Sequence, residues 1–271
     1  MRRAVIFCNK GHSQKIRMKL NSESAKAFLK GTSLNASGQQ VTKVEPLSEL
    51  TAVSRVDLGN NIIKTSESLQ GLAGLTNLTW LNLSHNGLTS LQLPSSLAKL
   101  QVLNISHNKL QEFPDLSHFT NLKAVIANNN EISKVPPAHL SSSLNTLVLS
   151  HSKLELVPDL SGKEKLVKLS LSHNMVKEFP SKLPEGLAEL RLNGNKLVQT
   201  SLIPSKVNLL DLGNNGYSSM EDLKGLTGGK PMKCLKNLSI KGNPLTKIDL
   251  EQLTEWFPRL TALDNKPLAN K

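Results

Sequence analysis

The sequence has little of what usually stabilises a small secreted domain or anchors a protein in a membrane. It contains two cysteines in 271 residues, and Cys8 and Cys234 lie too far apart to suggest a disulfide framework or a metal-ligand motif. Its longest apolar runs are only a few residues, well short of a membrane-spanning helix, and its N-terminus lacks the apolar core of a secretory signal. We therefore expect free thiols in a reducing, intracellular compartment and no contact with a membrane.

Motifs for catalysis are absent as well. The sequence contains no G-x-S-x-G, no phosphate-binding glycine loop and no H-E-x-x-H. Glu189 and Asp211 fall in neighbouring units of the repeat described below, but Arg191 beside them indicates a structural charge cluster. We therefore predict that the protein is not an enzyme and that it uses no cofactor, metal or small-molecule substrate.

Acidic residues are nearly missing from the N-terminal segment 1–30. Glu23 is the single acid there against eight lysines and arginines, a net charge of +7, whereas the whole chain carries +12. Such a cluster attracts phosphate backbones. The candidate RNA contacts are Arg2, Arg3, Lys10, Lys15, Arg17 and Lys19. Two further interpretations stay open: an organelle transit peptide, which the period-2 pattern of residues 15–20 argues against, and a basic face that is only solvated.

A repeat dominates the rest of the chain. Aromatic residues make up 3% of the sequence but leucine occurs 50 times, so the interior must be built from aliphatic side chains. The pattern L-x-x-L-x-L-x-x-N-x-L matches in nine registers, and their starting numbers differ by 25, 22, 22, 22, 22, 21, 20 and 28 in turn. The registers start at Val53, Leu78, Leu100, Leu122, Leu144, Leu166, Leu187, Val207 and Leu235. A fixed period of this length indicates a stacked solenoid, whose units bury their apolar faces only against one another.

Each unit predicts a short strand, a turn and an irregular return segment. In "LTWLNLSHN" the alternation of Leu81 and Leu83 is typical of a strand with one face in the core. The asparagine that recurs after each strand is expected to bond backbone groups in the turn, as at Asn86. Ser152 replaces it once, which predicts a turn weakened by ~1 kcal/mol. Prolines recurring at 22-residue intervals, as at Pro114, favour extended or 3₁₀ pieces over full helices.

This pattern resembles the leucine-rich repeat superfamily, and its period is similar to that of the short intracellular subclass that includes the regulatory subunit of protein phosphatase 1 and the spliceosomal A-prime protein. The resemblance implies an α/β solenoid, a horseshoe with a parallel sheet on its concave side and short 3₁₀ or extended segments on its convex side. We expect a basic N-terminal cap over residues 1–31, a solenoid over 32–245 and a C-terminal cap over 246–271.

The two caps have their own local patterns. "AVIF" (residues 4–7) and "KIRMKL" (15–20) predict a β-hairpin. "SESAKAFLKG" (22–31) then predicts a short helix that starts from a Ser cap, and "SSMEDLKGL" (218–226) another in the longest unit. At the other end "IDLEQLTEWFPRL" (248–260) predicts a helix that covers the last unit. The covering side chains are expected to be Leu250, Leu253, Trp256 and Phe257.

The concave sheet is where leucine-rich repeats usually bind a protein partner. The candidate contacts on it are Trp80, His85, His107, Lys123, Asn129, His151, Lys168 and Arg191. Trp80 has two interpretations, a binding anchor or a side chain packed on the N-terminal cap. The recurring histidines also have two, a solvated row of turns or pairs that share a metal ion, although no third ligand lies in their row.

Together these features predict a non-enzymatic interaction scaffold. The leading hypothesis is a component or assembly factor of a ribonucleoprotein particle, ribosomal or pre-ribosomal. Its basic N-terminal end would contact RNA and its concave sheet would bind protein, in the nucleus or nucleolus, with the cytoplasm as the second possibility. The alternative is a regulatory or adaptor subunit of an enzyme such as a phosphatase, or of a cytoskeletal motor.

Overall fold

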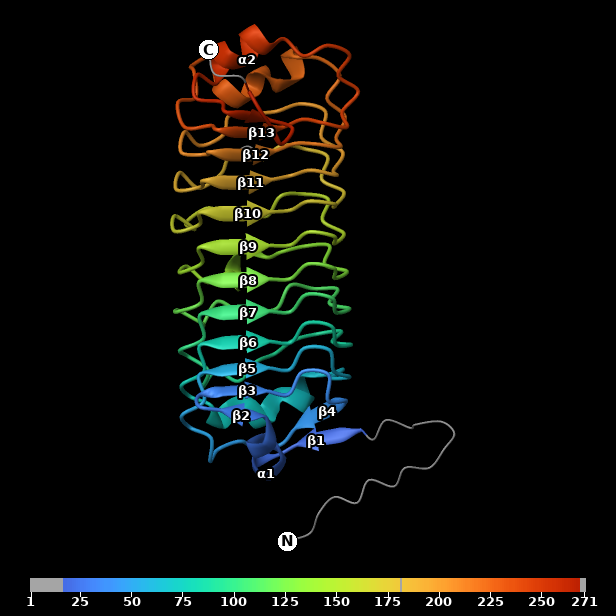
Figure 1. Ribbon diagram of the computed structural model, residues 1–271, viewed down its shortest axis with the longest axis vertical. Coiled ribbons are helices and arrows are strands. Elements are labelled where there is room, and N and C mark those ends of the chain that lie inside the picture. The colour runs from blue at the N-terminus through green and yellow to red at the C-terminus, as the bar shows by residue number, and fades with distance from the viewer. Residues whose placement is uncertain (1–16, 181, 269–271) are drawn as a thin grey trace, which may run out of the picture.

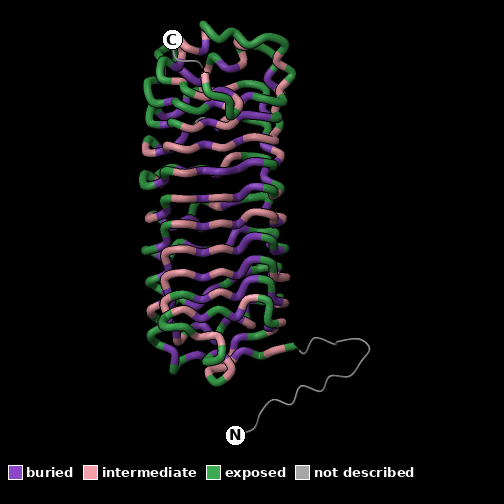
Figure 2. The backbone as a smooth tube through the Cα atoms, viewed as in Figure 1, coloured by how far each residue is buried: buried purple, intermediate pink, exposed green. Residues whose placement is uncertain are grey.

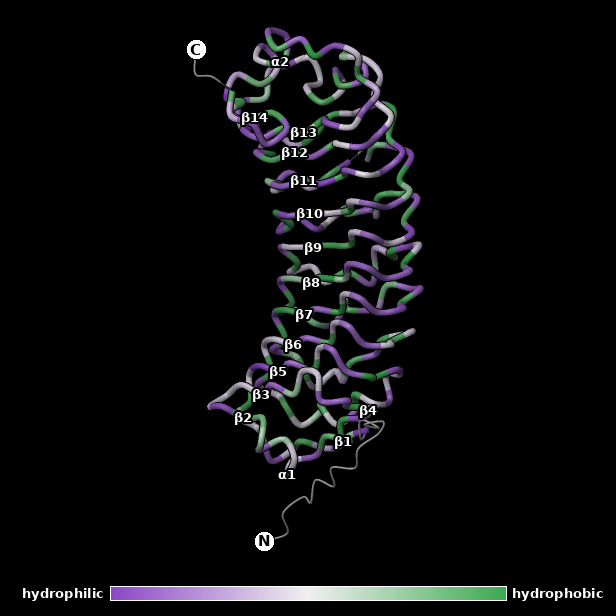
Figure 3. Tube along the Cα trace, turned by 45° about the vertical axis from the view of Figure 1, so that its right-hand side comes forward, coloured by the Kyte–Doolittle hydropathy of each residue, from purple (hydrophilic) through white to green (hydrophobic). Residues whose placement is uncertain are grey.

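Short strands stack one per repeat into an elongated, curved solenoid (Figure 1). This computed structural model describes residues 17–180 and 182–268. The sheet follows the inner side of the curve (Figure 3), so the predicted concave parallel sheet is confirmed. Its strands are β2 (Leu29–Lys30), β3 (Ser33–Asn35), β5 (Arg55–Asp57), β6 (Trp80–Asn82), β7 (Val102–Asn104), β8 (Ala124–Ile126), β9 (Thr146–Val148), β10 (Lys168–Ser170), β11 (Glu189–Arg191), β12 (Leu209–Asp211), β13 (Asn237–Ser239), β14 (Ala262–Leu263) and β15 (Lys266–Pro267).

The strands pair in the register of the sequence repeat. Leu103 of β7 lies between Leu81 of β6 and Val125 of β8, and all three side chains are fully buried. Equivalent leucines therefore form continuous columns through the interior. Buried backbone segments recur in successive units along the solenoid (Figure 2). Because burying one such side chain contributes about 1.5–3 kcal/mol, the columns supply most of the favourable free energy of folding.

The recurring asparagine links each unit to the one before it. The Asn108 Nδ2 donates to the backbone oxygens of Leu83, Ile105 and Ser106 at 3.0, 3.0 and 3.2 Å, and its Oδ1 accepts from the Leu88 N–H at 3.1 Å. The same kind of bonding recurs at Asn61, Asn86, Asn130, Asn174, Asn195, Asn215 and Asn243. We call this set the asparagine ladder. It confirms the predicted role of the turn asparagines and adds Asn61.

The ladder is interrupted at Ser152. The serine Oγ is buried and has no hydrogen-bond partner among the described residues. In the neighbouring units the asparagine oxygen accepts from the N–H of Leu110 and of Leu154. The equivalent N–H, that of buried Ile132, also has no acceptor in the described part of the chain. The shorter side chain therefore leaves both a hydroxyl and a backbone donor unpaired inside the stack.

Between β5 and β13 the described return segments contain 3₁₀ helices and no α-helix, as predicted, although only one of them follows a recurring proline, Pro136. These are η2 (Ser66–Gly74), η3 (Pro137–His139) and η4 (Glu221–Thr227). The helix predicted over residues 218–226 is η4, which takes the 3₁₀ form. In η2 the chain packs closely on the first unit, since a side chain on Gly71 would meet the backbone oxygens of Val44 and Glu45.

The N-terminal cap differs from the prediction in two ways. Strand β1 (Met18–Leu20) pairs in parallel with β4 (Val41–Val44), while residues 4–7, its predicted hairpin partner, lie outside the described residues. The predicted helix over 22–31 is also too long. It begins after Asn21 as α1 (Ser22–Ala25), continues as the 3₁₀ turn η1 (Lys26–Phe28) and then gives way to β2.

Tertiary pairing explains the shorter helix. Asn21 and Ser24 form a reciprocal capping box, so Asn21 is the cap in place of the predicted serine. Leu29 and Lys30 then pair with Leu34 and Ser33 of β3, and this ladder overrides their helical preference. Within β1 the predicted alternation holds, since Lys19 is exposed and Leu20 is buried.

The C-terminal cap contains the predicted helix, α2 (Leu250–Trp256). Leu253 and Phe257 are fully buried and Trp256 is partly buried, as expected. The prediction is wrong for Leu250, which is 51% exposed. The Asp249 side chain accepts from the N–H groups of the first turn and so starts the helix at Leu250, which leaves that turn facing solvent.

An antiparallel strand lies at each end of the parallel sheet in the described part of the chain. At one end β2 pairs antiparallel with β3, and at the other β15 pairs antiparallel with β14. Each of these end strands has two residues. Short end strands leave little unpaired backbone on which another chain could build.

Restoring the missing ladder residue should stabilise the solenoid. We expect Ser152→Asn to raise the free energy of unfolding by about 1–2 kcal/mol, because the amide would pair the Ile132 N–H and the carbonyls that the serine leaves unbonded. Equilibrium urea unfolding measures this change.

The matched control is Asn130→Ser, which creates the same gap one unit earlier and should lower the free energy of unfolding by a similar amount. A destabilised Ser152→Asn protein would show that the space at this turn cannot hold the amide.

Candidate functional site

The concave face is made of side chains from the two outward positions of each strand. In the sequence Trp80-Leu81-Asn82 the middle residue is buried and its neighbours are partly exposed, and most strands repeat this arrangement. In-register pairing places equivalent residues side by side. One row consists of Arg55, Trp80, Val102, Ala124, Thr146, Lys168, Glu189, Leu209 and Asn237, and the next of Asp57, Asn82, Asn104, Ile126, Val148, Ser170, Arg191, Asp211 and Ser239.

Apolar side chains gather in the middle of this face. Val102 pairs with Trp80 on one side and with Ala124 on the other, and in the next row Ile126 pairs with Val148. All five are only partly buried, so their outer surfaces remain in contact with water. We call these residues the apolar centre. The predicted concave contacts include Trp80 but none of the other four residues of the centre, although comparing the same position across successive units would have found them.

Trp80 is stacked with an arginine from the preceding strand. The Arg55 guanidinium carbon lies 3.4 Å from the centroid of the Trp80 ring, and the two residues are paired across β5 and β6. This contact places Arg55 on the Trp80 ring, and the role of Trp80 as a binding anchor stays a prediction. A cation over an indole face contributes about 0.5–1 kcal/mol at an exposed site and holds the ring in place.

An ion cluster lies on the C-terminal side of the apolar centre. One oxygen of Glu189 contacts both Lys168 Nζ at 3.0 Å and Arg191 Nε at 2.6 Å. Burial on its own would raise the pKa of Glu189, but the hydrogen bonds from Lys168 and Arg191 outweigh it and hold the pKa below its ordinary value. The glutamate is thus kept ionised and fixes the positions of two of the predicted concave residues.

The recurring histidines occupy a backbone position with special requirements. His85, His107, His151 and His173 all have φ between 52° and 54°, as does Asn129 in the unit between them. This left-handed conformation is tolerated best by Gly, Asn, Asp and His. In the next unit Gly194 takes the place, and a side chain there would collide with the His173 ring. The phrase "SHN" therefore recurs because the turn needs a left-handed residue followed by the ladder asparagine.

The histidines form two stacked pairs along one edge of the sheet. The rings of His85 and His107 are 3.9 Å apart with an interplanar angle of 11°, and those of His151 and His173 are 4.3 Å apart at 13°. Parallel rings direct their ring nitrogens in parallel planes, so a stacked pair does not converge on one ion. Residues 17–180 and 182–268 contain no group of three or more metal-ligating side chains.

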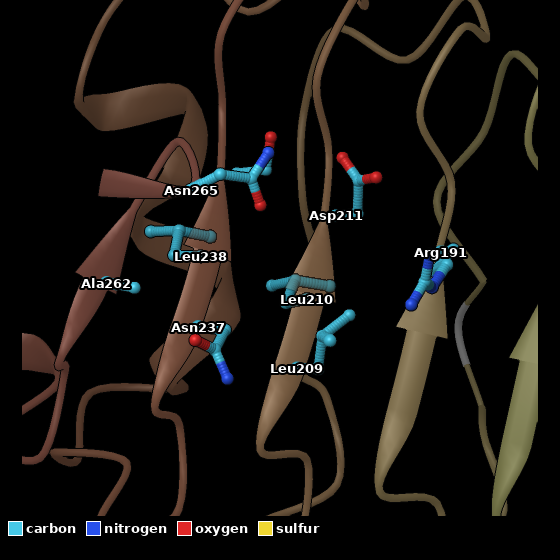
Figure 4. A pocket seen from close by; sticks show the side chains of 9 residues that line it. Arg191, Leu209, Leu210, Asp211, Asn237, Leu238, Ala262 and Asn265 are labelled. Atoms are coloured by element: carbon cyan, nitrogen blue, oxygen red, sulfur yellow. The ribbon is translucent and has the colours of Figure 1, made fainter. Parts of the chain in front are cut away.

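A shallow hollow of about 240 Å³ opens on the concave face near its C-terminal end (Figure 4). Leu209 and Ala262 give it apolar walls, and Asp211, Asn237 and Asn265 add polar groups. It spans β11 to β14, beyond the ion cluster, and Arg191 borders it. No feature of the sequence pattern predicted it.

The predicted concave residues all lie on this side of the solenoid. Trp80, Lys168 and Arg191 are in strands, Lys123 precedes β8, and His85, His107, Asn129 and His151 line the turn edge. Of the predicted RNA contacts, Arg17 and Lys19 are exposed at β1. Arg2, Arg3, Lys10 and Lys15 lie outside the described residues. The binding role of both sets stays a prediction.

Comparison with known proteins agrees with this architecture. The family model described as "Leucine Rich repeats (2 copies)" matches residues 76–118. A leucine-rich repeat protein of Leptospira interrogans superposes with a TM-score of 0.61 at 22% identity over 83% of this chain and 64% of its own. The chain has the leucine-rich repeat fold, and residues 76–118 match a leucine-rich repeat family model.

Two further leucine-rich repeat structures share the fold. YopM of Yersinia pestis has a TM-score of 0.66 at 24% identity, covering 86% of this chain and 65% of its own, and TLR13, solved with ssRNA13, has 0.70 at 23%, covering 90% and 41%. This leucine-rich repeat chain thus spans less than two thirds of each protein. No curated protein sequence matches it. No helix in residues 17–180 and 182–268 is long and apolar enough to cross a bilayer.

The stacked histidines should be visible in a pH titration. Burial first, and then the charges of His85 and His151, lower the pKa of His107 below its ordinary 6.5. A depressed histidine pKa means that the unfolded state takes up its proton first, so this residue makes the protein less stable as the pH falls below about 6.5. NMR titration should place the His107 midpoint below 6.5, and His85→Asn should move it part of the way back.

The His85→Asn substitution keeps a residue that tolerates the left-handed turn, as Asn129 does. Since burial remains, recovery should be incomplete. A His107 midpoint that does not respond to this substitution would mean that the two rings do not interact in solution.

Proposed function

We propose that the protein is a non-enzymatic scaffold that binds an extended segment of another protein across its concave sheet. The observation that carries the proposal is the apolar centre, a continuous group of partly exposed apolar side chains on an otherwise polar face. Protein interfaces commonly have an apolar core with a polar rim, and tryptophan and arginine are enriched among the residues that dominate binding. The leucine-rich repeat fold is consistent with such a role.

The rigidity of the centre supports this use. It covers strands β6 to β9, which at about 4.8 Å per strand span roughly 14 Å, or about four residues of an extended peptide. Trp80 is held by Arg55, so it loses little freedom on binding. A partner segment would thus place two or three apolar side chains on the centre.

The charges around the centre define the rest of the partner. Lys123 is exposed before β8 without a salt bridge among the described residues, and the Lys168–Glu189–Arg191 cluster carries a net positive charge. Acidic side chains in the partner would complement both. We therefore propose an apolar segment flanked by Asp or Glu.

The finer hypothesis, a component or assembly factor of a ribonucleoprotein particle, rests on the N-terminal charge of +7. TLR13, a protein of similar fold, was solved with an RNA strand, so a leucine-rich repeat solenoid can hold RNA. The structure adds one constraint. Leu20 and Ala25 are buried in the cap, so removing residues 1–30 would damage the fold as well as the charge.

The concave proposal can be tested by selecting peptides from a random 12-residue display library on the full chain. Selected peptides should carry apolar residues beside acids, and Val148→Asp should weaken their binding at least tenfold by burying a charge in the interface. Affinities are measured by fluorescence polarisation.

Val198→Asp is the matched control, because it makes the same substitution at a 56% exposed valine in the return segment after β11. If the selected peptides bind the Val148→Asp protein with unchanged affinity, the proposal is refuted. Submicromolar binding of a phosphatase catalytic subunit that disappears with Trp80→Ala would favour the adaptor alternative.

The ribonucleoprotein hypothesis calls for substitutions that spare the cap. A full chain with Arg2, Arg3, Lys10 and Lys15 replaced by Gln should show weaker salt-sensitive co-sedimentation with large RNA-containing particles, because four cations that could pair with phosphates are gone. Density gradients of cell extract at low and high salt measure this. Unchanged sedimentation of the substituted chain would exclude the segment as the RNA contact.

A further inference from the structure

The positive charge of the protein is concentrated in two places. Besides the N-terminal segment 1–30, with +7, the segment 223–248 contains six lysines and no acid. Since the whole chain carries +12, the remainder has a net charge of −1. The second segment surrounds β13 and belongs to the described, folded end of the solenoid.

Lys233 and Lys236 of this segment lie along the edge where the chain enters the sheet, and Lys206 and Arg259 lie on the same edge in the units before and after. Lys206, Cys234 and Arg259 each directly precede the first apolar residue of their units, so they occupy equivalent places in successive units. Side chains at this place reach one another, as the 2.7 Å bond from Lys99 to Asn77 shows for two neighbouring units. Lys233 and Lys236 flank Cys234. We call Lys206, Lys233, Lys236 and Arg259 the basic edge.

The basic edge is not neutralised by the surface around it. All four side chains are exposed, and none takes part in a salt bridge within the described residues. Earlier units differ, because Glu164 and Glu185 occupy the place that Lys233 takes in its own unit. The acid of α2 that is nearest to Arg259 along the chain, Glu255, is exposed and forms no salt bridge with any described residue.

The hollow of the concave face lies directly beside this edge. Asn237, which lines the hollow, follows Lys236 in the chain, and Ala262 pairs with Asn237 across the sheet (Figure 4). Leu209 and Ala262 offer an apolar surface, while Asp211, Asn237 and Asn265 offer donors and acceptors. Cations at the rim and an apolar hollow with amide groups match a phosphate backbone and a nucleobase.

We propose that the C-terminal end of the solenoid binds single-stranded nucleic acid, with phosphates on the basic edge and one base in the hollow. A duplex would keep its base faces stacked and out of the hollow. An anionic membrane is a poorer fit, because peripheral binding needs exposed apolar side chains next to the cations. Leu202 lies near Lys206 in the sequence, but the other exposed apolar side chains of this end, Ile248 and Leu250, follow β13, whereas Lys206, Lys233 and Lys236 precede it.

The charge part of the proposal is tested with a fluorescent 20-nucleotide uridine RNA. The protein is the full chain with Arg2, Arg3, Lys10 and Lys15 changed to Gln, so that the N-terminal segment contributes little. Replacing Lys233, Lys236 and Arg259 by Gln should weaken binding at least tenfold. It should also flatten the plot of log affinity against log salt by about 2, since three phosphate contacts at about 0.7 each are lost.

The control replaces Lys109, Lys134 and Lys196 by Gln, which removes the same charge from exposed lysines elsewhere on the solenoid. It should change affinity less than twofold. Equal losses in the two triple variants would mean that only net charge matters and would overturn the site. Stronger binding to phosphatidylserine vesicles than to RNA would assign the edge to a membrane instead.

The hollow is tested by comparing RNA with inorganic polyphosphate, which has the charge but no bases. Leu209→Ser should weaken RNA binding about fivefold or more and leave polyphosphate binding unchanged. Asn237→Ala provides a second variant at an exposed position, with the same expectation, should Leu209→Ser fold poorly. If the variants lose equal affinity for RNA and polyphosphate, or lose none for RNA, the hollow does not bind a base. If the hollow does not bind a base, the proposed protein-binding role of the apolar centre is unaffected, because that role depends on different residues.

Discussion

The asparagine ladder is the interaction on which the rest of this structure depends. Each ladder amide bonds carbonyls of its own turn and of the preceding unit, and its oxygen accepts a backbone N–H from that unit. The bonds satisfy backbone groups where the strand ladder ends. They also fix where each unit lies on the one before, so equivalent residues fall into straight rows. Both the leucine columns inside and the rows of side chains on the concave face follow from this alignment.

The ladder also limits the residues on either side of it. The place before each asparagine must be left-handed, which restricts it to residues such as His107, Asn129 and Gly194. Stacked imidazoles at this edge are thus first a consequence of turn geometry. Their proximity then changes their chemistry, since burial and neighbouring charge disfavour the protonated form of His107.

The repeating part of the fold could be predicted from the sequence, because nine copies of one pattern state the same local requirement. Segments that occur once were harder. Leu29 and Lys30 read as helix because their local preference is helical, and only the nearby β3 makes them a strand. The sites lie between these cases. The location of Trp80 and Arg191 on the concave sheet follows from their place in the repeat, whereas the Arg55 contact with Trp80 and the hollow at Leu209 depend on neighbours in other repeat units.

The antiparallel strands at the two ends of the sheet bear on how copies of the protein meet. A parallel sheet with open ends is a head-to-tail template, and identical copies joined that way form filaments rather than closed assemblies. Here β2 and β15 occupy those positions, and Pro267 in β15 has no N–H to offer a further strand. Polymerisation through the sheet is thereby disfavoured at both described ends. The length of the concave surface is accordingly set by the repeats within one chain and not by its concentration.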